Sequence, residues 1–354
     1  GSFSRLDATT FEADATNIAS EFFAGCGVLS GSSAGEIASD ISGSFISGFD
    51  YSGNIQTTPG GVFQASDNLP IPASGGTAGS MVAGNAIQAS GLVSPFPYKG
   101  AQTQLYNGSS WSEVNDQISA RDANGTTLVG TSAAALLFGG CSDGSTEEWN
   151  GTNWSEVNDG DTSMRDGQGT GESSEAAIFT WYAGGGNLEW NGTNWSEISD
   201  AGQQRYTAGM IGSRDSALFF GGYSGAQHKL TELWNGSSWT ELNDMLEEFS
   251  QGFGFGSSND GVAVGGSRPA ITPWPGGSTP SGTSSQLWNG TSWSTGPNMN
   301  TGRHQRFGYG GSQMTPSGVS NEGFVAGGSA GSHPHVQAAT EIFPSNVSSA
   351  SFGR

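Results

Sequence analysis

Four arginines each follow a tryptophan at a nearly constant spacing in the sequence. Clustered arginine side chains can form an anion-binding site. Arg121, Arg165, Arg205 and Arg303 follow their tryptophans by 10, 11, 10 and 10 residues. Guanidinium groups bind a carboxylate through paired hydrogen bonds, as a sialidase-like site would require. The regular spacing also admits a structural interpretation, in which the arginines bond to backbone carbonyls of neighbouring units in a repeated fold.

Histidines and cysteines provide the candidates for metal chemistry. The chain has four histidines, and two of them, His333 and His335, flank Pro334 in one short segment. Two imidazoles in one loop could ligate a metal, although an ordinary polar loop is the alternative interpretation. A copper radical oxidase also needs a cysteine beside tyrosines, and Cys141 has no tyrosine motif next to it. Two cysteines alone indicate neither a disulfide framework nor a zinc site.

Common catalytic motifs are absent from the sequence. It contains no G-x-S-x-G elbow, Walker sequence, HExxH helix or paired-carboxylate motif. Acidic clusters such as Asp159-Gly160-Asp161 lack the spacing of an EF-hand loop. We therefore expect a non-enzymatic protein without a cofactor. Calcium remains a candidate ion for which the sequence identifies no site, and the metal content is left as unknown.

The charge balance narrows the choice of partners. Lys and Arg number 11 against 32 Asp and Glu, so the formal net charge is −21. Phosphate binding needs a basic surface, and we therefore expect no nucleic-acid partner. No run of about 18 apolar residues occurs, which predicts no membrane insertion. Solubility is the simplest role for the acidity, with cation binding as the alternative.

A repeated hairpin motif predicts the architecture that positions these residues. An aromatic residue, Asn-Gly, two further residues and a tryptophan recur five times, with closing tryptophans Trp111, Trp154, Trp195, Trp239 and Trp293. The intervals of 43, 41, 44 and 54 residues are close to the roughly 40–50 residues of a four-stranded propeller blade. Asn-Gly suits a hairpin tip because both residues tolerate positive backbone angles. The aromatics recur in equivalent places, so we expect them to pack between blades rather than to bind ligands.

A second repeated element, an apolar run ending in Gly-Gly, completes the count of blades. Five clear copies end at Gly140, Gly186, Gly222, Gly266 and Gly328, and the weaker segment Met81–Asn85 is taken as a sixth. The last copy has no closing tryptophan strand after it, whereas Phe63 lies 48 residues before Trp111. We therefore predict an all-β, six-bladed β-propeller whose last blade is completed by an N-terminal strand near Phe63. Closure of this kind removes exposed sheet edges.

The strands of one blade can be predicted individually. We expect Thr207–Ile211 innermost, followed by Ser216–Phe220, Thr231–Trp234 and an outermost strand over Ser238–Leu242. Each arginine then begins the innermost strand of a blade, near the central channel. Two blades carry Ala73 and Phe249 at that place, so the ring of channel anion candidates would be incomplete.

These repeats resemble those of a known group of proteins. The segments 217–222 (ALFFGG) and 231–241 (TELWNGSSWTE) are similar to kelch-like repeats, and more closely to repeats in structural proteins of marine tailed phages such as cyanophages. The resemblance covers about residues 61–343. Segments 2–11 and 37–45 look like the Ser/Gly-rich fibre segments of such virion proteins. The resemblance implies a tail or head fibre or another virion appendage, extracellular in the free particle. It does not imply a ligand, because fold and function separate easily.

The domain organisation follows from the limits of the repeats. Residues 1–58 are predicted to be an extended stalk or assembly arm, 59–343 the propeller, and 344–354 a C-terminal tail that rejoins the stalk. The arm is too short to bury a core alone, so we expect self-association and contacts with other virion structural proteins through it. An arm folded back on its own propeller is the alternative.

Loops that break the repeat are the candidates for ligand binding, because a rigid scaffold carries recognition on its connections. The longest is 267–285, with Arg268 and with Trp274 outside the repeat register. Segment 90–99 holds Phe96 and Tyr98, and 329–336 holds the two histidines. We predict an adhesion module for a host-surface glycan or protein. The alternatives are a propeller enzyme acting on surface polysaccharide and a purely structural decorating subunit.

Overall fold

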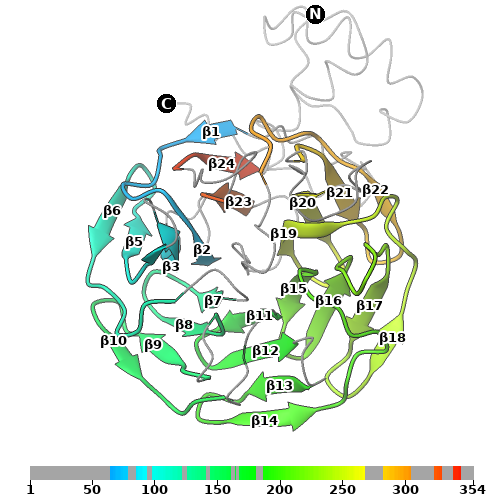
Figure 1. Cartoon of the computed structure of the whole chain (residues 1–354), viewed down its shortest axis with the longest axis horizontal. Helices are drawn as coiled ribbons and strands as arrows, with labels where there is room; N and C mark the ends of the chain where they lie inside the picture. The colour runs from blue at the N-terminus through cyan, green and yellow to red at the C-terminus, as the bar shows by residue number, and fades with distance from the viewer. Residues whose placement is uncertain are drawn as a thin grey trace, which may run out of the picture. The chain divides into compact units, whose positions relative to one another are not determined.

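The computed structural model shows an all-β propeller. It describes residues 64–78, 85–93, 98–121, 126–140, 144–160, 164, 167–180, 186–267, 282–303, 323–328 and 338–343. All of these belong to one compact unit, residues 61–344, while 1–60 and 345–354 fall in a second unit outside the described residues. Six sheets surround a centre (Figure 1), and within each sheet all pairs of strands are antiparallel. The prediction of a six-bladed all-β propeller is therefore confirmed.

Five of the sheets have four strands along their main path, and we number them as blades 1 to 5. Blade 1 contains β2 (Ala73–Ala78), β3 (Ile87–Val93), β5 (Thr103–Tyr106) and β6 (Trp111–Val114), with the short β4 (Tyr98–Lys99) paired to β3. Blade 2 contains β7 (Thr127–Gly130), β8 (Ala135–Phe138), β9 (Glu147–Trp149) and β10 (Trp154–Glu156). Blade 3 contains β11 (Gln168–Ser173), β12 (Ala176–Thr180), β13 (Asn187–Trp190) and β14 (Trp195–Ile198).

Blades 4 and 5 repeat the same plan. Blade 4 contains β15 (Gly209–Ser213), β16 (Ser216–Phe220), β17 (Thr231–Trp234) and β18 (Trp239–Glu241). Blade 5 contains β19 (Ser250–Gly256), β20 (Gly261–Ser267), β21 (Ser285–Trp288) and β22 (Trp293–Thr295). In each blade the first strand lies nearest the centre and the fourth lies at the rim (Figure 1).

The sixth blade joins the two ends of the repeat region, as predicted. Its described strands are β23 (Gly323–Ala326), β24 (Thr340–Phe343) and β1 (Gln64–Ser66). β1 pairs with β24 through Gln64 opposite Ile342, so an N-terminal strand completes the last blade. Phe63 itself lies outside the described residues. Leu69 N donates to Ala338 O at 2.8 Å, as Met299 N donates to Thr283 O in blade 5, which supports the alignment of these two segments.

The predicted strands of blade 4 match the structure closely. The two middle strands have the predicted limits. The innermost strand begins at Gly209 rather than Thr207 because Thr207 has a φ of 54°, outside the extended region. The outermost strand begins at Trp239 because Ser238 belongs to the hairpin tip, where its N–H donates to Asn235 Oδ1.

One predicted repeat copy is wrong. The second strand of blade 1 is β3, which pairs with both β2 and β5, and not the segment around Met81. Residues 81–84 lie outside the described residues. Ser90 and Gly91 occupy the Gly-Gly places, with φ values of 71° and 95°, close to the 71° and 69° of Gly139 and Gly140. The Gly-Gly pattern does not include this copy because a serine stands at the first place. Its left-handed conformation is one that only glycine adopts without strain.

Both aromatics of each hairpin are scaffold, as predicted. In four blades the first is a tryptophan whose Nε1 donates to a carbonyl between the two inner strands of its own blade, at 2.9–3.0 Å. The closing tryptophan instead reaches the preceding blade: Trp154 Nε1 donates to Thr103 Oγ1 at 2.8 Å, and Trp293 Nε1 to Thr231 Oγ1 at 2.9 Å. Phe220 of blade 4 meets Trp293 of blade 5 edge-on, with ring centroids 5.1 Å apart.

The Gly-Gly segments allow the closest approach between blades. A Cβ on Gly221 would lie 2.4 Å from Phe249 O, and one on Gly265 would lie 2.5 Å from Arg303 O, both in the next blade. The second glycine donates its N–H across the same junction, as Gly222 N does to Phe249 O at 2.6 Å. At Gly221 and Gly265 a side chain would collide with this backbone, so the two blades would have to move apart.

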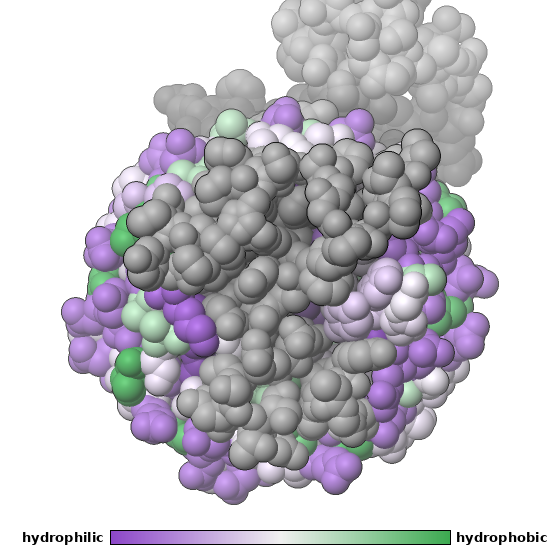
Figure 2. Space-filling view, viewed as in Figure 1, coloured by the Kyte–Doolittle hydropathy of each residue, from purple (hydrophilic) through white to green (hydrophobic). Residues whose placement is uncertain are grey.

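The rim is polar. The outermost strands expose serine and glutamate, as in β6, where Ser112 and Glu113 are exposed between buried Trp111 and half-buried Val114. Hydrophilic residues accordingly dominate the coloured periphery of Figure 2. Charged side chains on an edge strand oppose pairing with other chains. Within the described ranges, no helix has the length and apolar character needed to cross a membrane.

Trp154 and Trp111 form a matched pair for testing the indole hydrogen bond. Each side chain is 7% exposed, but Trp111 Nε1 is buried without a hydrogen-bond partner. We expect Trp154→Phe to cost about 1–2 kcal/mol more in the free energy of unfolding than Trp111→Phe, because only the former leaves a hydroxyl oxygen without its donor. Urea unfolding of both variants measures the difference, and equal costs would contradict it.

Candidate functional site

The strand ends that border the connections that break the repeat lie on one face of the propeller. In an antiparallel blade, the connection from the second to the third strand and the connection to the next blade lie at the same end of the sheet. We call this side the loop face. The segments containing Phe96, Trp274 and His333 each join a second strand to a third, namely β3 to β5, β20 to β21 and β23 to β24. The described strand ends that border all three segments therefore lie on the loop face.

The side chains of these ligand candidates are not described. Phe96, Arg268, Trp274, His333 and His335 lie outside the described residues, as does Arg165. Tyr98 lies in β4, where its backbone pairs with Val93, but its side chain is outside the described part. Ligand binding at these residues stays a prediction.

Three of the four repeated arginines are described, and each forms a buried ion pair with a glutamate of its own blade. Arg121 Nη2 lies 3.0 Å from Glu147 Oε1, Arg303 Nη2 lies 2.7 Å from Glu341 Oε1, and Arg205 pairs with Glu232. The arginine side chains have no exposed surface, and the glutamates are at most 6% exposed. Each pair joins the start of a blade to the blade's third strand.

Carbonyl oxygens take up further arginine donors. Arg121 Nη1 donates to Gly139 O at 2.9 Å and to Ser145 O at 2.7 Å. Arg303 Nη1 donates in the same way to Gly327 O and Ala339 O, both at 2.8 Å. The first carbonyl of each set belongs to the Gly-Gly segment. The structural interpretation predicted carbonyl partners in neighbouring blades; the partners are indeed backbone carbonyls, but they belong to the arginine's own blade.

The glutamate also accepts hydrogen bonds from backbone N–H groups of the connection that precedes the blade. We call the arginine, its glutamate and the backbone groups bonded to them the arginine–glutamate clasp. Glu147 accepts from Ile118 N at 2.7 Å and from Ser119 N at 3.1 Å. Glu341 accepts from Asn300 N at 2.7 Å and from Thr301 N at 3.0 Å. A carboxylate that accepts from two backbone N–H groups and a guanidinium has both its hydrogen bonds and its charge satisfied. A charged group can be buried only under that condition.

Glutamine replaces glutamate in the two blades that lack the arginine. Gln104 stands in the blade of Ala73, and its Oε1 accepts from Ile71 N at 2.8 Å. Gln286 stands in the blade of Phe249, and its Oε1 accepts from Leu246 N at 2.8 Å. In five of the six blades, therefore, glutamate stands where the arginine is present and glutamine where it is absent; the blade of Arg165, with Leu188 at this place, is the exception. The predictions from the sequence did not include these partners, although the correlation is readable in the repeats.

This geometry corrects the channel-anion hypothesis for Arg121, Arg205 and Arg303. An anion site needs guanidinium donors turned toward the channel, whereas these groups are enclosed and matched by carboxylates. Burial lowers the pKa of Arg205 and of Arg303 from the usual value, and the adjacent glutamates oppose the shift. The lowered pKa reflects the desolvation of a charge that contributes to scaffold and not to ligand binding.

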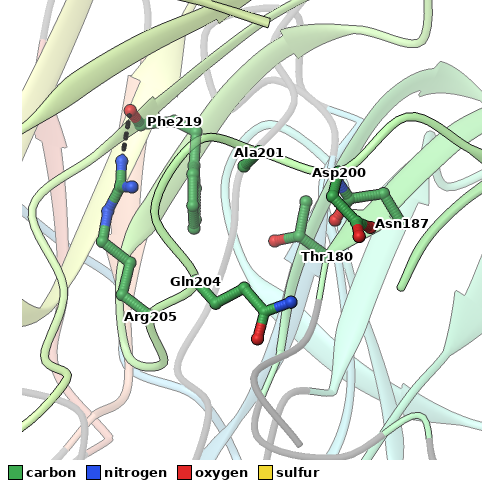
Figure 3. Close-up of a pocket in the computed structure, with 7 residues that line it drawn as sticks. All are labelled: Thr180, Asn187, Asp200, Ala201, Gln204, Arg205 and Phe219. Atoms are coloured by element: carbon green, nitrogen blue, oxygen red, sulfur yellow. Dashed lines mark hydrogen bonds between the residues drawn. The ribbon is translucent and has the colours of Figure 1, made fainter. Parts of the chain in front are cut away.

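A small polar pocket opens between blades 3 and 4 on the loop face. Its cavity of about 10 Å³ holds roughly one water molecule and is too small for a sugar. Figure 3 shows its polar lining, to which Thr180 and Asn187 come from blade 3, and Asp200 and Gln204 from the connection to blade 4. Arg205 also lines it but points toward Phe219, donating from Nη2 to Phe219 O at 3.1 Å.

Beside this pocket lies the loop-face connection of blade 4, residues 223–230. Ser224 Oγ and His228 Nε2 are 2.6 Å apart, and the rings of Tyr206 and Tyr223 pack edge-to-face with centroids 5.4 Å apart. Burial, and then repulsion from Arg205, lowers the pKa of His228 below its usual value, while Glu248 acts in the opposite direction. The lowered pKa favours the neutral imidazole at pH 7. The cluster offers aromatic surface and uncharged hydrogen-bonding groups.

Metal ligation finds no geometric support in the part of the chain that the structure describes. No group of three or more His, Cys, Asp or Glu there is placed to hold an ion. His333 and His335 are not among those residues, so the hypothesis of a metal at that loop stays a prediction.

Comparison with known proteins bears on the fold. No protein-family model matches the chain, and no curated protein sequence matches it. Among solved structures, 378 chains match, so the likeness is to a widely used architecture. One of them, the structure of YjhT, superposes with a TM-score of 0.60 at 13% identity, over 79% of this chain and 97% of that one. At this identity the likeness shows the β-propeller fold alone.

The chain itself suggests a test of the arginine clasp, because blade 5 already uses Phe249 with Gln286. Arg121→Phe leaves a buried carboxylate and Glu147→Gln leaves a buried guanidinium, so we expect each change to cost about 3–5 kcal/mol in the free energy of unfolding. The double variant should cost at least about 2 kcal/mol less than the sum of the single changes. Urea unfolding of the four proteins measures this coupling, and additive costs would contradict the clasp.

Proposed function

We propose that this chain is a non-enzymatic appendage subunit of a tailed-phage virion, with an assembly arm and an adhesive propeller. The kelch-like form of its repeats and the fibre-like Ser/Gly-rich segments near residues 2–11 and 37–45 support the virion assignment. In this proposal the protein is part of the tail or capsid appendage and is extracellular in the free particle. Its ligand is a host-surface glycan or protein.

The distribution of side chains between scaffold and loops is the single observation that carries the adhesive role. Except for Trp111, the repeated tryptophans donate their indole N–H groups to other parts of the ring, and the three described repeated arginines are paired with glutamates. The segments that depart from the repeat, including the one with Trp274, each connect a second strand to a third, and the described ends of these strands lie on the loop face. A rigid ring that presents variable loops on one side is suited to recognition.

The proposed partners follow from charge and domain organisation. Residues 1–58 mediate self-association and contacts with other virion structural proteins. With a formal charge of −21, the chain repels nucleic acid and anionic membranes, and the proposal includes neither as a partner. It includes no cofactor, and calcium is retained only as an ion to be tested.

A propeller enzyme that acts on surface polysaccharide is the second candidate. The observation that favours it is the 2.6 Å contact between Ser224 Oγ and His228 Nε2, since a nucleophile and its base lie within such reach. Turnover of polysaccharide by the purified chain would establish this candidate and overturn the non-enzymatic part of the proposal. A decorating subunit would instead have its loop face covered by neighbouring subunits in the assembled particle.

Adhesion is tested with the full chain on an array of bacterial surface polysaccharides and defined glycans, alongside binding to intact bacterial cells. We expect saturable binding without degradation of the glycan, and we expect Trp274→Ala to weaken it about tenfold, because Pro-aromatic loops lose little entropy on binding. Glu113→Gln on the rim is the control and should leave binding unchanged. Absence of binding to both glycans and cells would overturn the adhesive role.

Assembly is tested by comparing the full chain with a chain of residues 59–354, which retains β1. We expect the full chain to form oligomers or fibres and the shorter chain to be monomeric with the same unfolding midpoint. Light scattering after size-exclusion chromatography measures the mass, and electron microscopy shows the particles. Equal oligomeric states for the two chains would contradict an assembly role for residues 1–58.

A further inference from the structure

The tyrosine pair at the start of blade 4 is not required by the repeat. Tyr206 follows Arg205, and the corresponding place after Phe249 holds Ser250. Tyr223 follows Gly222, and serine or cysteine follows the Gly-Gly segments that end at Gly140, Gly266 and Gly328. Inter-blade packing, which explains the tryptophans, therefore does not explain these two rings.

The backbone presents the two tyrosines as a rigid unit. Tyr206 N donates to Tyr223 O at 3.1 Å and Tyr223 N donates to Tyr206 O at 2.9 Å, so the two residues form an isolated antiparallel bridge. Their rings meet at 60°, and both residues are half-buried. Aromatic surface held in this way on the loop face loses little conformational entropy when a ligand covers it.

Hydrogen-bonding groups without charge lie next to the rings. The backbone fixes the Ser224–His228 contact, because Ser224 N donates to Ala226 O at 3.1 Å and His228 N donates to Gly222 O at 2.9 Å. Gly225, in the same turn, has open space where a Cβ would be. Hydroxyl and neutral imidazole can each donate or accept, depending on the tautomer. Paired donor and acceptor groups of this type suit the hydroxyls of a sugar.

The charges nearby favour an uncharged ligand. Arg205, the guanidinium beside this cluster, has no exposed side-chain surface and pairs with Glu232. Lys229, the exposed cation next to His228, donates from Nζ to Leu246 O at 2.8 Å, and Glu248 lies near enough to His228 to act on its pKa. Asp200 and Gln204, which line the adjoining pocket, are exposed and contribute a carboxylate and an amide. An anionic glycan would meet this carboxylate and a guanidinium already neutralised, whereas a neutral sugar would meet additional hydrogen-bonding groups.

We propose that Tyr206, Tyr223, Ser224 and His228 form a subsite for a neutral pyranose ring, which packs on the tyrosine rings and bonds through its hydroxyls to Ser224 and His228. The subsite rests on the proposed adhesive function and specifies its ligand class. It is carried by residues outside the three loops predicted from the sequence.

The test uses the full chain on an array of neutral glycans ending in glucose, galactose, mannose or N-acetylglucosamine, together with sialylated and sulfated glycans. We expect binding to neutral termini, and a loss of affinity of about tenfold in Tyr223→Ala and about a hundredfold in Tyr206→Ala/Tyr223→Ala. Ser224→Ala should weaken binding severalfold while the tyrosines remain. Ile118→Ala, which truncates an apolar side chain that is 58% exposed at the junction of blades 1 and 2, is the matched control and should bind as the unaltered chain does.

Unfolding midpoints of all variants separate a binding defect from a folding defect. If the double tyrosine variant does not fold, Tyr223→Phe and Ser224→Ala test the subsite instead. We expect Tyr223→Phe to retain the packing of the sugar on the ring, and Ser224→Ala to lose the hydroxyl contact with the sugar. Neutral-glycan binding that no variant weakens would overturn the subsite and leave the adhesive function standing. Binding confined to acidic glycans, or binding to cells without any glycan binding, would also overturn it.

Discussion

At four of the six junctions of the ring, an indole N–H donates to the preceding blade. Trp154, Trp195 and Trp293 each donate to a threonine hydroxyl of the preceding blade, and Trp239 donates to Ser199 O. Burying such a donor unpaired would cost most of what the indole ring contributes. A blade is therefore complete only when its neighbour is in place, and the same interaction that buries the aromatic surface also sets the spacing of the blades. At the junction of blades 1 and 6 both Trp111 Nε1 and Thr340 Oγ1 are buried without a partner, and there the pairing of β1 with β24 and the bond from Gly328 N to Ala73 O join the ends.

The arginine–glutamate clasps hold the inner part of the same framework. Each one binds the connection between blades, the Gly-Gly segment and the third strand through one buried pair. A buried ion pair contributes little net stability over an apolar pair of equal volume, but either charge alone is strongly destabilising. The two blades with glutamine instead of glutamate and no arginine are consistent with this constraint. In these blades both the arginine and the glutamate are replaced by uncharged residues. The glutamine still accepts from a backbone N–H, and no counter-ion is needed.

A division between scaffold and recognition surface follows from these two interactions. The repeated tryptophans and the three described repeated arginines, residue types that often bind ligands at protein surfaces, belong here to the scaffold. The proposed recognition role therefore falls to the loop face, where the segments that depart from the repeat begin and end. The rim is unsuited to association, because its short outer strands expose serine and glutamate at the sheet edge. The propeller thus has one side on which contacts can vary without disturbing the ring.

The sequence alone determined the architecture, because propeller blades are specified by local signals that repeat: Asn-Gly tips, aromatics on paired strands and Gly-Gly segments at fixed intervals. These signals placed the middle strands of blade 4 and the closing strand before Leu69 correctly. They failed at Ser90, where serine adopts the left-handed conformation usually reserved for glycine. Only the tertiary structure decided the role of the arginines and revealed the cluster around Tyr206 and His228. Arg121 and Glu147 are 26 residues apart, and nothing local to either one states whether the guanidinium meets a ligand or a carboxylate of its own blade. That outcome depends on how four strands fold back on one another, which brings distant residues into contact.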